Sequence, residues 1–278
     1  MMSKRIVITG ATSGLGKATA EQLAAAGARL VICSENEAAL LKTLTAMGGE
    51  SDRLSGLVAD VTNPDQVEAL ATQAQLRYGG LDVWINNAGM AAPSGNGALV
   101  PMALGEQLIN TNILGTYYGS VTAVRHFRNA GCAGRIINMT GRGDKGPVKN
   151  AALYSSSKAW LRNFTLALAM EEREHGIEIG TFNPGLTLTG ITARPMILAG
   201  NEAQQMKGLR TILPLIGDPA SEPARSLAAL ALQTAPIKKE NRHRRLLPHV
   251  LLRLITGKRA DIDVTAIEPR LVAPELSR

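Results

Sequence analysis

Short runs of apolar residues alternate along this chain with longer stretches in which apolar residues recur every three or four positions. A continuous apolar run such as Ile6-Val7-Ile8 is typical of a strand buried on both faces, and the longer stretches are typical of amphipathic helices. Their alternation predicts right-handed βαβ units and a single-domain α/β fold with a parallel, doubly wound sheet. Strands are predicted at 6–8, 28–33, 56–59, 81–85, 134–139 and 177–182, and helices at 17–26, 36–47, 64–78, about 102–129 and 151–175.

Three glycines follow the first predicted strand. The strand ends in Thr9-Gly10, the loop carries Gly10, Gly14 and Gly16, and a helix follows. Such glycines let the backbone turn tightly and approach a phosphate, while the helix end offers free N–H groups and a positive dipole. The arrangement predicts a pyrophosphate site, although its spacing, G-x-x-x-G-x-G, differs from the commonest dinucleotide fingerprint. For this loop alone, a tight turn that binds nothing is the alternative.

Polar residues gather where the predicted strands end. Ligands of a parallel, doubly wound sheet bind outside the carboxyl ends of its strands, and a bare scaffold would not need polar residues at that one edge. The sequence therefore predicts a ligand site there, formed by Thr9-Gly10, Ser34-Glu35, Asp60, Asn86-Asn87, Thr140 and Asn183-Pro184-Gly185.

These motifs resemble, in order and spacing, those of the short-chain dehydrogenase/reductase family. The resemblance covers about residues 4–235 and implies a Rossmann-type enzyme that uses NAD(P)(H) to interconvert a carbonyl and an alcohol. The matching pieces are TGATSGLG at 9–16, DV at 60–61, NNAG at 86–89, Asn112 in NTNILG, the Y-S-S-S-K run from Tyr154 to Lys158, and PGLTLT at 184–189.

The resemblance implies that a nicotinamide cofactor lies along these motifs, with no metal ion. Asp60 would contact the adenine, Asn86 and Ala88 would line the cofactor, and 184–189 would hold the nicotinamide side. The candidate cofactor-binding residues are Thr9, Gly10, Thr12, Ser13, Gly14, Leu15, Gly16, Ser34, Glu35, Asp60, Val61, Asn86, Ala88, Gly89, Tyr154, Lys158, Pro184, Gly185, Thr187 and Thr189.

Tyr154 and Lys158 are the candidate acid–base pair. A tyrosine with its ordinary pKa of about 10 is a poor acid–base catalyst at pH 7. A lysine four residues later lies on the same helical face, and its charge favours the phenolate and lowers the tyrosine pKa. Tyr154 would then transfer a proton while the nicotinamide transfers hydride. The resemblance also implies that Asn112 supports the site through ordered water. The alternatives are a tyrosine packed on the core and a solvated lysine.

One position departs from the family pattern. Where the family usually carries a serine, this chain has Gly141, which has no hydroxyl to steady a substrate carbonyl. Three interpretations are open. Thr140 or a backbone N–H makes that hydrogen bond, the substrate brings its own polarising group, or the chain binds a nucleotide as a scaffold or sensor without catalysis.

The residues after the second predicted strand favour NAD(H) over NADP(H). An acid there hydrogen-bonds the ribose hydroxyls and repels a 2′-phosphate, whereas an arginine accepts the phosphate. This chain has Ser34 and Glu35 at that place, and Ser13 stands where NADP-preferring relatives often carry a basic residue. Against this preference, Lys17 or Arg29 could reach a phosphate, and Glu35 could be a solvated loop acid.

The net charge of +7 belongs to one segment. Residues 237–259 hold eight basic residues and one acid, which leaves the rest of the chain neutral, so no nucleic-acid-binding fold is expected. The apolar stretch at 249–256, bounded by basic residues, suits an interfacial helix on an anionic membrane, with a docked helix or a dimer contact as alternatives. The strand and glycine-rich turn with which many family members end are not found. We expect a dehydrogenase domain over 1–236 and a basic extension over 237–278.

Residues 189–217 are rich in Met, Leu and Ile without a clean period. In the resembled family this region covers the substrate, and its composition suggests an apolar substrate, with a packed helix pair as the alternative. NMTGRGDKGP, Gly141, WINNAG and the basic, Leu-rich tail more loosely resemble the chlorophyll b reductase group, which reduces a formyl group on a large apolar pigment.

Composition favours a cytoplasmic globular protein. Hydrophobic residues make up 45% of the chain, mean hydropathy is +0.02, and no apolar run is long enough to span a membrane. The first strand begins too early to leave room for a signal peptide. Cys33 and Cys132 fall near different strands, so reduced thiols are expected. A homo-oligomer is expected, and peripheral membrane contact through 237–259 is the alternative to a purely cytoplasmic location.

Overall fold

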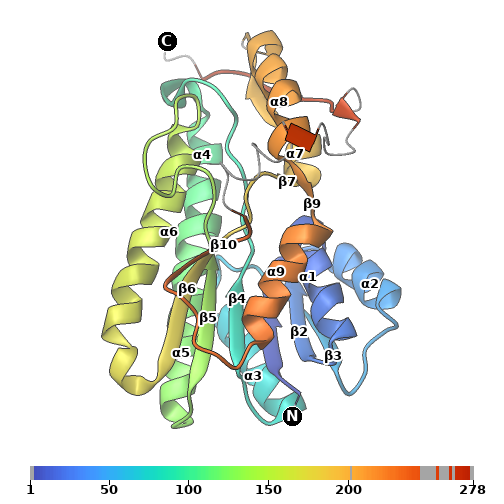
Figure 1. The fold of residues 1–278 in the computed structure, drawn as a ribbon, viewed down its shortest axis with the longest axis vertical. Helices are drawn as coiled ribbons and strands as arrows, with labels where there is room; N and C mark the ends of the chain where they lie inside the picture. The colour runs from blue at the N-terminus through green and yellow to red at the C-terminus, as the bar shows by residue number, and fades with distance from the viewer. Residues whose placement is uncertain (1–2, 201, 245–254, 257–262, 265–266, 276–278) are drawn as a thin grey trace.

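The computed structural model describes residues 3–200, 202–244, 255–256, 263–264 and 267–275. Its central sheet has seven parallel strands in the order β10-β6-β5-β4-β1-β2-β3, flanked by helices on both faces (Figure 1). This confirms the predicted α/β fold with a doubly wound, Rossmann-type sheet. The strands are β1 (Arg5–Ile8), β2 (Arg29–Ser34), β3 (Leu54–Val58), β4 (Val83–Asn86), β5 (Gly134–Met139), β6 (Ile177–Asn183) and β10 (Glu240–Arg242).

Two hydrophobic cores lie on opposite faces of this sheet. Along β1, Ile6 and Ile8 point into the core beneath α1, α2 and α9, whereas Val7 points into the core beneath α3, α5 and α6. Strands buried on both faces must be apolar at every position, which is why continuous apolar runs marked them. The helices are α1 (Gly14–Ala25), α2 (Glu37–Ala46), α9 (Ser221–Leu232), α3 (Pro64–Tyr78), α5 (Gly115–Asn129) and α6 (Ala152–Glu171).

The long helix predicted at about 102–129 forms with an irregular segment inside it. α4 (Met102–Leu108) continues into a π-helical segment, η2 (Ile109–Leu114), and then into α5. The π-helical segment carries Asn112, whose side chain is buried. Wider π turns of this kind are frequent at functional sites. The helix predicted at 151–175 is α6 followed by a 3-10 turn, η3 (Arg173–His175).

Residues 189–217, called the lid below, lie beyond the carboxyl ends of the strands, where α7 and α8 appear above the sheet in Figure 1. Ile197, Met206 and Leu213 form a small separate core with Ile267, which comes from the C-terminal extension. The lid is therefore packed around its own apolar residues. It contains α7 (Gly190–Ala193), β8 (Met196–Leu198) and α8 (Glu202–Ile216), and the short paired strands β7 (Thr187–Leu188) and β9 (Asp218–Pro219) flank it. A further 3-10 turn, η1 (Gly97–Leu99), precedes α4.

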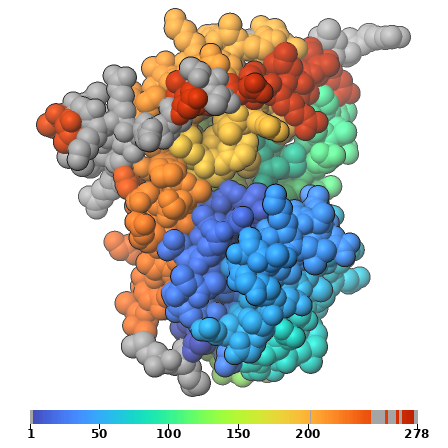
Figure 2. Space-filling model, turned by 90° about the vertical axis from the view of Figure 1, so that its right-hand side faces the viewer, coloured from blue at the N-terminus to red at the C-terminus, as the bar shows by residue number. Residues whose placement is uncertain are grey.

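The C-terminal extension folds back onto the lid. β11 (Arg270–Val272) pairs in parallel with β8, which places Leu271 beside Ile197. Beyond β11, the N–H of Glu275 donates to the carbonyl of Leu99 at 3.0 Å. The Glu275 carboxylate accepts the N–H of Met102 at the start of α4, at 2.6 Å. Figure 2 shows the red C-terminal segment lying against the yellow and orange lid.

One strand of the central sheet lies where the sequence predicted none. β10 pairs with β6, matching Glu240 to Thr181 and Arg242 to Asn183. Its residues are polar because an edge strand has one open side, and an ion pair from Glu240 to Arg162 at 2.6 Å helps to hold it. The sequence showed no closing strand with a glycine-rich turn, but the structure places a strand after residue 236, and the sheet extends to Arg242.

The interfacial helix predicted at 249–256 falls mostly outside the described residues. Within it, 255–256 are helical and exposed. Among the helices in the described part of the chain, none combines the length and apolar character needed to cross a bilayer.

Candidate active site

The glycine loop after β1 is tied to the loop after β4. The Thr9 hydroxyl accepts hydrogen bonds from the N–H groups of Asn87 (3.1 Å) and Ala88 (3.0 Å), and the Asn87 amide donates to the carbonyls of Thr9 and Gly10. Gly10 has φ +62°, and a Cβ there would lie 2.8 Å from the Ala88 Cα. A Cβ on Gly16 would collide with the Gly10 carbonyl and the Asn87 amide. Both glycines are therefore required by close approach, and the two loops form one rigid surface.

Asn86 and Asn87 play different parts from those expected. The side chain of Asn86 is buried beneath α5, where it accepts from Trp84 Nε1 (2.7 Å) and donates to Asn138 (2.8 Å) and Ser120 (3.1 Å). It thus braces the sheet against the helix instead of facing the cofactor loop. Asn87, which was not among the candidate cofactor residues, is the side chain that fastens the glycine loop.

The start of the lid touches the glycine loop. Gly14, the first residue of α1, has φ +51°, and a Cβ there would lie 3.1 Å from Thr189. Thr189 begins α7 in a reciprocal capping box with Thr192. Ser13 precedes α1 in extended conformation without a side-chain cap hydrogen bond, so Ser13 does not satisfy the N–H groups of the first turn. Leu15 lies in that turn.

The residues at the ends of β2 and β3 form the predicted adenosine side. Ser34 Oγ lies 3.2 Å from the Thr12 hydroxyl and accepts the N–H of Asn36, while Glu35 is exposed. Asp60 Oδ1 accepts the N–H of Thr62 at 2.8 Å. Val61, beside Asp60, is buried and packs closely on Gly115.

Asn112, Tyr154 and Lys158 converge beyond the end of β5. Asn112 accepts the N–H of Met90 (2.8 Å) and donates to the Met90 carbonyl (3.0 Å), so it holds the loop segment that follows Gly89. A Cβ on Gly89 would lie 3.2 Å from Asn112 Oδ1 and 3.8 Å from Lys158 Nζ. The Lys158 ammonium donates to the Met139 carbonyl at 3.1 Å and lies 5.6 Å from the centre of the Tyr154 ring.

The pKa of Tyr154 moves in the direction opposite to our expectation. Burial, helped by the negative charge of Asp144, raises the pKa of Tyr154 to about 12. Burial lowers the pKa of Lys158 to about 8, against a smaller raising effect of Asp144. The structure thus gives a raised pKa for Tyr154 where a lowered one was expected: burial is the main cause, and the Lys158 ammonium is directed toward the Met139 carbonyl.

Gly141 lies directly against the Tyr154 hydroxyl. A Cβ at this position would come within 2.7 Å of Tyr154 Oη and 3.7 Å of Lys158 Cγ. The phenol thus occupies the space that a serine side chain would need. Tyr154 can hold this position only because residue 141 has no side chain.

Two buried hydroxyls near this edge make no hydrogen bond in the described structure. They are Thr140 Oγ1, just after β5, and Thr187 Oγ1, at the start of β7. Thr140 extends the ladder, since its N–H donates to the Phe182 carbonyl at 3.0 Å, and alternation places its side chain on the Asn138 face of the sheet. At the end of β6, the Asn183 side chain accepts the N–H of Gly185, which follows Pro184.

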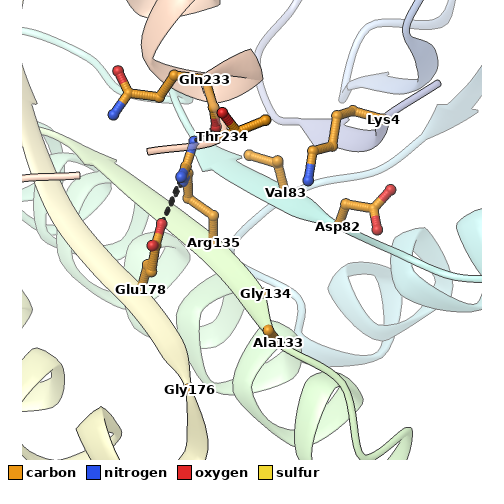
Figure 3. Close-up of a pocket in the computed structure, with 10 residues that line it drawn as sticks. All are labelled: Lys4, Asp82, Val83, Ala133, Gly134, Arg135, Gly176, Glu178, Gln233 and Thr234. Carbon is orange, nitrogen blue, oxygen red and sulfur yellow. Dashed lines mark hydrogen bonds and ion pairs between the residues drawn. The ribbon is translucent and has the colours of Figure 1, made fainter. Parts of the chain in front are cut away.

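A cavity of about 180 Å³ lies at the opposite, amino-terminal end of the strands (Figure 3). Its main polar group is Arg135, which pairs with Glu178 at 2.6 Å and donates to the carbonyls of Leu230 and Gln233 at the end of α9. These contacts cap the C-terminal end of α9, which is a structural role. In the described residues, no group of histidine, cysteine and acidic side chains could hold a metal ion.

Comparisons with known proteins agree with this geometry. The family model described as short chain dehydrogenase matches residues 4–196. A putative ketoacyl reductase of the granaticin polyketide synthase from Streptomyces violaceoruber is 37% identical over 195 residues, which are 68% of this chain and 69% of that protein. A probable chlorophyll(ide) b reductase from Oryza sativa is 30% identical over 208 residues, covering 68% of this chain and 41% of that protein.

Solved structures give the same fold. The 3-ketoacyl-(acyl-carrier-protein) reductase from Brucella melitensis complexed with NADH matches with a TM-score of 0.74 and 25% identity, over 86% of this chain and 96% of that one. An actinorhodin polyketide ketoreductase with NADPH matches with a TM-score of 0.74 and 28% identity, over 86% of this chain and 95% of that one. Both nicotinamide cofactors thus occur among its structural neighbours.

Proposed function

This chain belongs to the short-chain dehydrogenase family and is an NAD(P)-dependent oxidoreductase, and from this premise we propose that it interconverts a carbonyl and an alcohol on a bulky apolar substrate. The convergence of Asn112, Tyr154 and Lys158 beyond the end of β5 carries the proposal. Ile191 and Ile212, which are 49% and 42% exposed on the lid, support an apolar substrate.

The residues around the glycine loop fit a dinucleotide. Gly10 and Gly16 let the glycine loop pack closely against the loop after β4, and α1 begins without a side-chain cap at Ser13, so the N–H groups of its first turn suit a pyrophosphate. Thr187 contributes a buried, unpartnered hydroxyl and Thr189 touches the loop, so both suit the nicotinamide side. When bound, the cofactor supplies or accepts the hydride.

In this proposal Tyr154 Oη moves the proton. Its raised pKa keeps the phenol protonated at neutral pH, which suits donation to a carbonyl oxygen and favours the reductive direction. Lys158 places a positive charge beside the phenol and would bind the cofactor ribose. Asn112 holds Met90 and the end of the adjoining loop, and Thr140 offers the hydroxyl that Gly141 lacks.

The first test replaces Tyr154 by phenylalanine. We expect Tyr154→Phe to abolish NAD(P)H oxidation with a panel of diacetyl, a 3-ketosteroid, a β-ketoacyl thioester and an aromatic aldehyde, because the proton donor is gone. Nicotinamide fluorescence should still report cofactor binding. The matched control is Tyr118→Phe, which removes a phenolic oxygen away from the site. Turnover retained by Tyr154→Phe would contradict the proposal.

A non-catalytic nucleotide sensor or scaffold is the second candidate, and Gly141 favours it, because it lacks the hydroxyl that steadies a carbonyl. Tight cofactor binding without turnover of any member of the panel, by both the natural chain and Tyr154→Phe, would support this candidate.

For the cofactor we propose a preference for NAD(H). The acid Glu35 lies directly after Ser34, where a 2′-phosphate would meet a negative charge. Fluorescence titration should give tighter binding of NADH than of NADPH, and Glu35→Arg should narrow or reverse the difference. Glu37→Arg, two residues further on in α2, is the control. Tighter binding of NADPH by the natural chain would contradict the preference.

We also propose a homo-oligomer formed through an aromatic surface on α5 and α6. Trp160 stacks on Phe164 with ring centres 4.9 Å apart, and Tyr117 meets Phe164 edge-on at 5.9 Å. Trp160 and Tyr117 are 37% and 41% exposed in a chain that is only 3% aromatic. Light scattering should give more than one chain per particle and a smaller mass for Trp160→Glu. A monomeric natural chain would contradict this part.

Peripheral contact with an anionic membrane is the proposal for the basic segment. Because β10 ends at Arg242 and belongs to the sheet, the variant should delete 245–259 and keep β10. We expect co-sedimentation with phosphatidylserine vesicles to be lost on this deletion. Equal sedimentation of both chains would reject the contact.

A further inference from the structure

A buried carboxylate lies between α6 and the edge strand of the sheet. Asp144 is 9% exposed, and it lies in the stretch NMTGRGDKGP, although it was not among the candidate site residues. Its Oδ2 accepts a hydrogen bond from Asn183 Nδ2 at 2.8 Å, and its Oδ1 lies 3.8 Å from Arg242 Nη2. A carboxylate is tolerated in the interior only where such partners are present. One partner comes from the end of β6 and the other from β10.

Asp144 belongs to the turn that covers the Tyr154 hydroxyl. Its N–H donates to the Gly141 carbonyl at 3.2 Å, and the Asn183 amide donates to the same carbonyl at 3.2 Å. Gly141 is the residue whose Cβ would touch Tyr154 Oη. Asn183 therefore holds both ends of the turn, which fixes the carboxylate relative to Tyr154.

Charged groups face this turn from each element packed against it. Glu240 is already paired with Arg162 (2.6 Å) and with Lys145 (3.4 Å). Asp144 is the charge that acts on both Tyr154 and Lys158. The titratable and charged groups in the described residues around it are Tyr154, Lys158 and Arg162 from α6, Arg142 and Lys145 from the loop, and Glu240 and Arg242 from β10; β6 contributes the neutral Asn183.

We propose that Asp144 is an electrostatic positioning residue for the Tyr154–Lys158 pair, and that Arg242 of β10 moderates its charge as a counter-ion. The catalytic meaning of this role rests on the proposed function. A negative charge favours the ammonium form of Lys158 despite its burial, and it disfavours the phenolate of Tyr154. Arg242 opposes both effects. In this way a strand outside the expected domain adjusts the acid–base pair.

The titration of Lys158 tests the role without a substrate. The pKa of Lys158, lowered by burial to about 8, lies where the folded chain can be titrated. Its ¹³Cε NMR signal is assigned by its loss in Lys158→Met and is then followed against pH, with and without NADH. Asp144→Asn keeps the shape and the contact with Asn183 but removes the charge. We expect it to lower the pKa of Lys158 by about one unit.

The counter-ion variant should act in the opposite direction. Arg242→Gln is expected to raise the pKa of Lys158 by about half a unit, less than the change for Asp144→Asn, because solvent and salt screen a partly exposed charge. Arg242 is 41% exposed. Lys145→Gln is the matched control, since Lys145 follows Asp144 but is 61% exposed and pairs with Glu240. It should leave the titration nearly unchanged.

The same variants should shift the alkaline limb of carbonyl reduction, downward for Asp144→Asn and upward for Arg242→Gln. An unchanged Lys158 titration in Asp144→Asn, or shifts of the same sign in both charge variants, would overturn the inference. A purely structural role would lower the rate without moving either titration. Turnover retained by Tyr154→Phe would instead refute the proposed function, and the NMR titration would still decide the effect of Asp144 on Lys158.

Discussion

Replacing Gly141 by alanine or serine adds a Cβ at the end of β5, beside the Tyr154 hydroxyl. That Cβ would lie 2.7 Å from Tyr154 Oη and 3.6 Å from Cζ. Favourable van der Waals contacts between such atoms begin at about 3.5 Å, so the phenol must move by roughly 0.8 Å. A displacement of about 1 Å in a catalytic group can reduce the rate about 100-fold. Overpacking of this kind costs about 1–3 kcal/mol of stability.

We therefore expect Gly141→Ala and Gly141→Ser to lower kcat/KM by similar factors, each about 100-fold. The assay is NAD(P)H oxidation with the best carbonyl of the panel, accompanied by urea unfolding to separate misplacement from loss of folding. Gly146→Ala is the control on the same loop, because nothing lies within 4 Å of the added Cβ. It should change kcat/KM by less than about twofold, as a surface substitution.

The comparison of alanine with serine decides the reasoning. If Gly141→Ser equals or exceeds the natural chain while Gly141→Ala is impaired, the serine hydroxyl is the missing catalytic group and the close approach of Tyr154 is no obstacle. Equal impairment of both variants supports a phenol that has taken the space of the side chain.

Three further predictions concern other parts of the chain. Arg135→Met should lower the free energy of unfolding in urea by about 3–5 kcal/mol, because it leaves the buried carbonyls at the end of α9 without their donor. The control is Arg125→Met at an exposed position, which should change this free energy by less than about 0.5 kcal/mol. Equal effects of the two variants would contradict the capping role. Burial raises the pKa of Cys33 to about 12, so iodoacetamide at pH 8 should modify half-buried Cys132 and spare Cys33 in the folded chain, as peptide mass spectrometry would report; rapid labelling of Cys33 would refute its burial. Asn112→Ala should lower kcat about 100-fold and the free energy of unfolding by about 1–3 kcal/mol, because the backbone at Met90 loses both of its hydrogen bonds to this buried side chain; unchanged kinetics of the folded variant would remove Asn112 from the site.

The buried strands were predictable because each of their side chains must be apolar. β3 shows where this reasoning weakens. It was predicted at 56–59 but spans Leu54–Val58. The prediction missed the start of the strand because the polar residue Ser55 interrupts the apolar pattern. Ser55 is nevertheless fully buried, and its hydroxyl accepts a hydrogen bond from the Tyr78 hydroxyl at 3.3 Å. β10 carries no apolar pattern at all, since pairing and ion pairs hold it at the edge. Local patterns find strands that are buried, and they miss strands that are held by partners distant in the sequence.

In the active site, the motifs located Tyr154, Lys158 and Asn112 but not the electrostatics around them. The pKa of Tyr154 depends on burial and on Asp144, and both follow from tertiary packing. The buried orientation of Asn86 could have been predicted from the alternation of side chains along a strand. Asn86 shares a face of β4 with Trp84, which points into the core. The role of Asn87 follows from the same alternation.

The way Glu275 fastens the chain end to α4 has a practical consequence for handling the protein. A purification tag or fluorescent fusion placed at the C-terminus would be joined three residues after a carboxylate that holds Met102. A chain shortened to the span of the family match, which ends at residue 196, would lose the whole lid core of Ile197, Met206, Leu213 and Ile267, together with α8, α9, β10 and β11. The N-terminus lies at the far end of the molecule (Figure 1). Tags are therefore best attached there.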